Sequence, residues 1–130
     1  YYADARRAGA IVRASWRAFD AAARSARGKT LARGPRGGGR DLDAIVGHVT
    51  ESDAGYLGAL GWRYRLVPGS PAQQLERTRD AMLDGLAAAA RGQIPERGPR
   101  GGVRRKPRHI VRRSAWHWLA SAWELEDRSA

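Results

Sequence analysis

The chain has 130 residues and a formal net charge of +11, a length that suits one domain able to fold alone. It contains no cysteine, which excludes disulfides, thiolate zinc sites and cysteine nucleophiles, so any metal ligand would be His, Asp or Glu. No run of about 18 apolar residues and no signal-peptide layout are present, so we expect a cytoplasmic protein without a membrane partner.

The excess of positive charge has two interpretations. A basic face can bind phosphates because binding releases counterions. However, all 24 basic residues except Lys29 and Lys106 are arginine, and alanine and glycine are abundant. This composition is expected of any protein encoded by a GC-rich gene. We therefore favour codon usage as the origin of the charge. The chain also begins with Tyr1 and not with methionine, so we expect residues 1–130 to be the C-terminal part of a longer protein.

Residues 3–27 are predicted to form an amphipathic helix that ends at Gly28. The residues on its apolar face are Ala5, Val12, Trp16, Phe19 and Ala23. Those on the opposite face are Arg6, Arg13, Arg17 and Arg24. Such a charged face is usually just solvated, so we assign it no function.

Two copies of the sequence RGPRGG, at 33–38 and 97–102, each precede a predicted helix. Glycine-rich turns before helix N-termini can cradle phosphates through free backbone N–H groups. Because no strand precedes either copy, the pattern is neither a Walker loop nor a dinucleotide fingerprint. We expect both copies to be linkers.

The second predicted helix covers 41–60 and ends before Gly61. Its apolar face comprises Leu42, Ile45, Val46, Val49, Tyr56, Leu57 and Leu60. His48 lies at the margin of that face, where a side chain would reach a groove between helices. A histidine there is either a half-buried structural residue or a ligand.

The segment 61–69 is irregular and long enough to cross most of a helical bundle. Ser70, Pro71 and Gln73 then form a capping box with proline at the first helical position, which predicts a third helix over 71–91. Its apolar stripe contains Leu75, Met82, Leu86 and Ala89. We assign no functional residue to this helix.

Positive charge is densest over 97–113, which holds seven arginines and Lys106. If the protein binds a polyanion, this segment is the predicted contact. No aromatic residue alternates with these arginines to stack on bases, and no nucleic-acid motif is present, so nucleic-acid binding stays an alternative.

The fourth predicted helix, 107–127, carries three of the five tryptophans. Its apolar stripe is Val111, Ala115, Trp118, Ala122 and Leu125. Its polar stripe is Ser114, His117, Ser121 and Glu124. A second apolar arc comprises Trp116, Leu119 and Trp123, which we expect to pack on a second copy of the chain or on an upstream segment.

Four amphipathic helices with a long connection between helices 2 and 3 predict an all-α four-helix bundle. The pattern resembles the DinB-like superfamily, which includes thiol-dependent S-transferases and maleylpyruvate isomerase-like domains. The resemblance covers nearly the whole chain and is carried by DLDAIVGHVTESDAGYL at 41–57 and by AWH at 115–117.

This resemblance implies a divalent-metal site, because family members typically bind the ion through one histidine on helix 2 and an HxxxH pair on helix 4. The implied ligands are His48 and His117, with Ser121 at the third position. Serine stays a neutral hydroxyl near pH 7 and binds zinc or nickel poorly, so the resemblance implies a weakly held ion. Glu124, about 10 Å from His117 along the helix, is the candidate catalytic base.

The function implied is a divalent-metal-dependent transferase or hydrolase with a degenerate metal site. One alternative is a non-catalytic binding or scaffold module of the same fold. A further alternative is an arginine-rich nucleic-acid binder.

Overall fold

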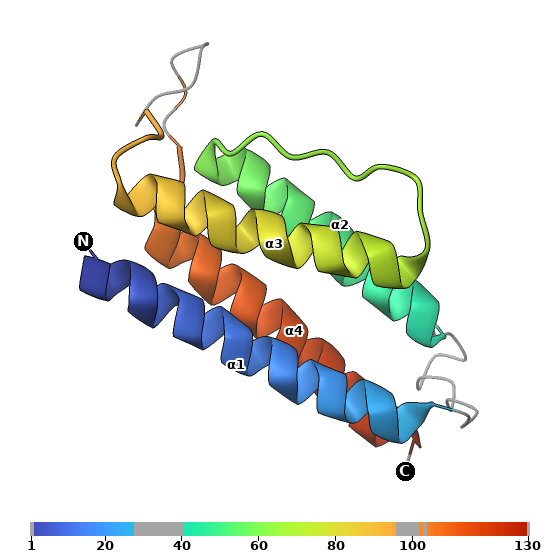
Figure 1. Ribbon diagram of the computed structural model, residues 1–130. Coiled ribbons are helices and arrows are strands. Elements are labelled where there is room, and N and C mark those ends of the chain that lie inside the picture. Colours follow the sequence, from blue (N-terminus) through green and yellow to red (C-terminus); the bar gives the residue numbers. More distant parts are fainter. Residues whose placement is uncertain (1, 28–40, 96–101, 103, 130) are drawn as a thin grey trace.

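The computed structural model describes residues 2–27, 41–95, 102 and 104–129, and these form four helices and no strand (Figure 1). The helices are α1 (Tyr2–Ala26), α2 (Leu42–Leu60), α3 (Pro71–Ala90) and α4 (Pro107–Ser129). Each predicted helix is confirmed, with ends within two residues of the expected ones. Gly28 and both RGPRGG copies, apart from Gly102, lie outside the described residues.

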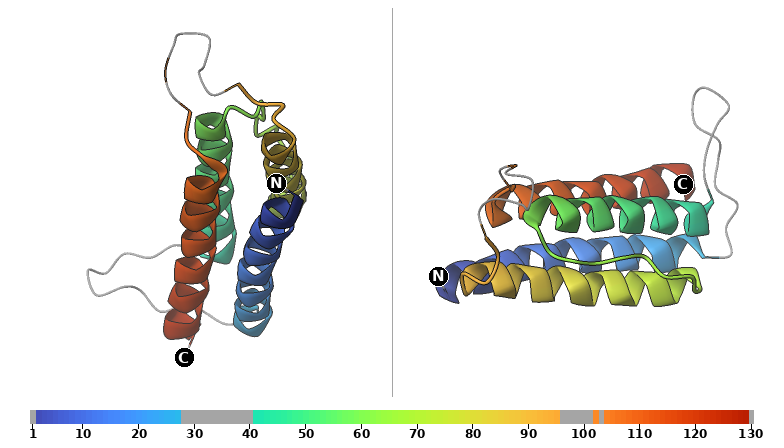
Figure 2. Two further views of the ribbon diagram at one scale, coloured as in Figure 1. Left: turned by 90° about the vertical axis from the view of Figure 1, so that its left-hand side faces the viewer. Right: turned by 90° about the horizontal axis from the view of Figure 1, so that it is seen from above.

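The helices form a bundle in which α1 runs parallel to α4, and α2 runs parallel to α3 in the opposite direction (Figures 1 and 2). α1 packs against α4, and α2 packs against both α3 and α4. The connection after α2 passes back along the length of the bundle before α3 begins, as its length predicted. This order places α2 beside α4, which are the two helices that carry the implied metal ligands.

Local capping sets the helix ends. Asp41 is the N-cap of α2, and its Oδ1 accepts a hydrogen bond of 2.8 Å from the backbone N–H of Ala44. Gly61 ends α2 in the left-handed region at φ 98°, which a residue with a Cβ rarely adopts. The predicted capping box of Ser70 and Gln73 at the start of α3 is also present.

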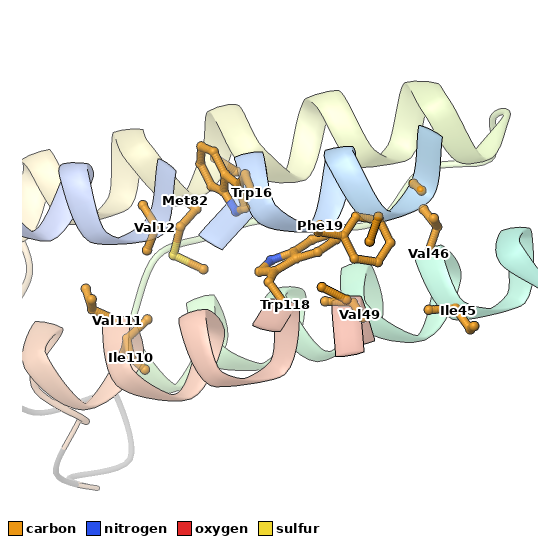
Figure 3. Packing of buried hydrophobic residues seen from close by; sticks show 14 of the residues in the cluster. Val12, Trp16, Phe19, Ile45, Val46, Val49, Met82, Ile110, Val111 and Trp118 are labelled. Carbon is orange, nitrogen blue, oxygen red and sulfur yellow. The ribbon is translucent and has the colours of Figure 1, made fainter. Parts of the chain in front are cut away.

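The core lies between the four helices and is built from their apolar stripes (Figure 3). The indole of Trp118 is fully buried and meets Phe19 of α1 edge-on, with ring centroids 4.8 Å apart. Every member of the predicted α4 stripe is buried, as are Val12, Trp16 and Phe19 of α1. Among the described helices, none combines the length and hydropathy needed to cross a membrane.

Candidate metal site

The imidazole rings of His48 and His117 face each other between α2 and α4. Their centroids are 5.5 Å apart with an interplanar angle of 59°. The side chain of His48 is exposed and that of His117 is half-buried. Two imidazoles that share one ion at bond lengths of about 2.0–2.1 Å have centroids roughly 5–6 Å apart. The predicted approach of the two histidines is thus confirmed, while metal binding itself stays a prediction.

Tyr56 is a further member of this cluster. Its hydroxyl lies 3.2 Å from Nδ1 of His117, and the two ring centroids are 5.8 Å apart. Tyr56 follows His48 by about two turns of α2, so both side chains lie along the same side of that helix. Sequence reasoning placed Tyr56 only on the apolar face. A hydrogen bond to one ring nitrogen orients the imidazole and fixes which nitrogen faces an ion.

The third ligand position remains unfilled by a strong ligand. Ser121, one turn after His117, is 6% exposed and has only a neutral hydroxyl to offer. Within residues 2–27, 41–95, 102 and 104–129, no group of three or more His, Asp and Glu side chains could hold a metal ion. Two histidines fit a divalent ion only as a partial ligand set, so water would supply the remaining ligands.

Glu124, the candidate base, is engaged in a local ion pair. Its Oε1 lies 3.1 Å from a guanidinium nitrogen of Arg128, one turn further along α4. The side chain of Arg128 is 11% exposed and that of Glu124 is 32% exposed, so the pair is half-buried. This pairing ties the carboxylate of Glu124 to its own helix.

A buried carboxylate of α2 joins this helix to α4. Asp53 is completely buried, and its two oxygens accept hydrogen bonds from Ser114 Oγ at 2.7 Å and from Trp118 Nε1 at 2.8 Å. Burial raises the pKa of Asp53 from 3.8 to about 6, although both hydrogen bonds and the charge of Arg79 oppose that shift. Asp53 follows His48 by five residues, so these two bonds join α2 to α4 within about one and a half turns of His48.

Arg79 extends this polar network to the other two helices. Its guanidinium makes a bidentate ion pair with Asp20 of α1, at 2.9 and 3.0 Å. The same group lies 4.9 Å from the ring centroid of Trp118 and 5.2 Å from that of Trp16, within the range of cation–π attraction. Arg79 of α3 therefore contacts residues of α1 and α4, and its charge also acts on Asp53 of α2.

Sequence reasoning missed Asp53 and Arg79, although each interrupts an apolar stripe. Asp53 follows Ile45 and Val49 at steps of four residues and precedes Leu57 by another four. A carboxylate in the middle of such a stripe predicts a buried and hydrogen-bonded group. The assignment of no functional residue to α3 overlooked Arg79, which occupies the same kind of position beside Met82.

An open pocket of about 300 Å³ adjoins the histidine pair. The residues lining it are Tyr56, Arg112, Arg113, Trp116 and His117. Two guanidinium groups beside the imidazole would favour an anionic ligand in this pocket. Trp116 and Trp123 of the predicted second arc are 64% and 57% exposed, and Leu119 is half-buried, so this arc does not belong to the bundle core.

Comparisons of the chain with protein-family models, with curated proteins and with solved structures found no match.

Proposed function

We propose that this protein is a DinB-like four-helix bundle that binds one divalent metal ion weakly through His48 and His117. The observation that supports this most directly is the 5.5 Å separation of their ring centroids. The hydrogen bond between Tyr56 and His117 adds the outer-shell contact that metal-binding histidines commonly have. With Ser121 in place of a third histidine, the ion is held by two protein nitrogens and is lost easily.

The activity that we propose for this site is transfer or hydrolysis on an anionic substrate. A divalent ion supplies Lewis-acid chemistry when it is bound. Arg112 and Arg113 line the pocket beside His117 and would attract and orient a negatively charged group there. Tyr56 would hold the His117 ring in place during that binding.

A non-catalytic binding module of the same fold is the second candidate. It is supported by the ion pair of Glu124 with Arg128, since a carboxylate tied to its own helix is poorly placed to move a proton elsewhere. Under this alternative the histidine pair has no role as a metal site.

Isothermal titration calorimetry with zinc and with nickel separates the two candidates. The proposal predicts binding of one ion per chain, and at least about tenfold weaker affinity in His48→Ala and in His117→Ala, because even outer-shell changes cost roughly that much. His109→Ala is the matched control, since His109 is an exposed histidine of the same helix that lies outside the pair. The absence of binding heat, or equal weakening by His109→Ala, would favour the non-catalytic module.

A further inference from the structure

The N-terminal ends of α1 and α4 lie at the same end of the bundle (Figure 2). Residues of α1, of the segment before α4 and of the start of α4 line a basic hollow there. Its volume is about 880 Å³. The basic residues that line it are Arg7, Arg104, Arg105, Lys106, Arg108 and Arg112. Among its described lining residues there is no Asp or Glu. The hollow therefore has a strongly positive potential that attracts anions.

Most of these cations are directed at solvent and not at a carboxylate. Within the described part of the chain, Arg105, Arg108 and Arg112 take part in no ion pair. Arg104 differs, because it donates a hydrogen bond to the carbonyl of Pro95 and has a role in the fold. Unpaired exposed arginines release counterions when they meet phosphates, and that release drives binding. The first turn of α4 adds the positive end of its helix dipole.

An exposed aromatic ring continues the basic surface along α4. Arg108, Arg112 and Trp116 follow one another at steps of four residues, so they form one stripe about 12 Å long. Arg112 lines both the basic hollow and the pocket that contains Trp116. No aromatic residue alternates with these arginines in sequence, but Trp116 follows them along the same helix surface.

From this arrangement we infer that the N-terminal half of α4, together with the residues just before it, binds single-stranded nucleic acid. Arg105, Arg108 and Arg112 contact successive phosphates, and a base stacks on the exposed ring of Trp116. A base in a duplex is already stacked on its neighbours, so a protein ring of this kind selects single strands. This inference goes beyond the proposed metal site and does not depend on it.

Fluorescence anisotropy with a labelled 20-nucleotide oligothymidine tests the contribution of charge. Reversal of Arg105, Arg108 and Arg112 to glutamate should weaken binding at least about a hundredfold at low salt and flatten its salt dependence. The matched control reverses Arg13, Arg17 and Arg24, which are exposed on α1 and outside the basic hollow. This control variant should bind oligothymidine less than tenfold more weakly than the original chain does. Equal losses in the two variants would show diffuse attraction and would overturn the inference.

Two tryptophan variants test stacking. Trp116→Ala should weaken oligothymidine binding about tenfold, whereas Trp123→Ala, which removes an exposed ring outside both pockets, should change it less than twofold. Binding of inorganic polyphosphate, a polyanion without bases, should be the same in Trp116→Ala and the original chain. The inference is wrong if Trp116→Ala leaves the affinity for oligothymidine unchanged, or if a duplex of the same length binds as tightly. It is also wrong if the only effect of Trp116→Ala is to dissociate a dimer of the protein.

Discussion

Asp53 is the buried carboxylate that joins α2 to α4 inside this bundle. It is fully buried, and both of its carboxylate oxygens are hydrogen-bonded to α4. Loss of either bond would leave a buried donor or acceptor unsatisfied, which costs about 1–3 kcal/mol. Burial also raises its pKa to about 6, so the folded protein holds a proton on Asp53 more tightly than the unfolded chain does.

That difference makes the stability of the protein depend on pH. Because the folded pKa of about 6 exceeds the value of 3.8 in the unfolded chain, the contribution of Asp53 is fully present below about pH 4 and is lost as the pH rises through 6. The loss amounts to roughly 3 kcal/mol, at 1.36 kcal/mol per pKa unit.

Urea unfolding at pH 4 and at pH 7 measures this effect. The free energy of unfolding of the original chain minus that of Asp53→Asn should be about 2–3 kcal/mol larger at pH 4 than at pH 7, because asparagine does not titrate. Asp84→Asn, which alters an exposed carboxylate of α3, should follow the original chain at both pH values. Equal pH dependence in the original chain and Asp53→Asn would mean that the folded pKa is not raised.

At the scale of the elements, the end of α2 is fixed by Gly61. The backbone N–H of Gly61, whose φ is 98°, donates hydrogen bonds to carbonyls of the last turn of α2. The side chain of Arg104 packs directly over Gly61. The backbone N–H of Arg105 also donates a hydrogen bond of 2.9 Å to the carbonyl of Ala59. The end of α2 and the segment just before α4 therefore stabilise each other.

A pair of glycine substitutions tests this junction. Gly61→Ala should lower the free energy of unfolding by about 1–2 kcal/mol, the cost of a side chain in the left-handed region. Gly58→Ala, on the exposed surface of the same helix with open space around it, should raise that free energy by up to about 1 kcal/mol. Chemical unfolding of both variants gives the comparison. A neutral or stabilising Gly61→Ala would contradict the left-handed cap.

The helices themselves were largely predictable from sequence because their signals are local. Ser70 with Gln73 marks the start of α3, and Gly61 marks the end of α2, without reference to any distant residue. The apolar stripes likewise identified the buried faces. Contacts between helices depend on which helices become neighbours. For that reason sequence reasoning missed the bonds of Asp53, whose partner Ser114 lies 61 residues away.

At the scale of the whole molecule, the candidate metal site depends on how α2 and α4 are joined. Asp53 contributes two hydrogen bonds to this joint, and Tyr56 contributes a third, to His117. The approach of His48 to His117 was expected only from the resemblance to the DinB-like superfamily, since spacing within one helix says nothing about a partner on another. The structure adds a buried joint between the same two helices, whose histidine rings lie 5.5 Å apart.

The most direct test of the shared metal site is a zinc titration followed by the imidazole nitrogen signals in long-range ¹H–¹⁵N NMR spectra. Single His→Gln variants assign the three histidines. We predict that the signals of His48 and His117 shift together along one binding curve that saturates at one zinc per chain, while those of His109 stay in place. Movement of only one member of the pair, or parallel movement of all three histidines, would contradict a shared site between α2 and α4.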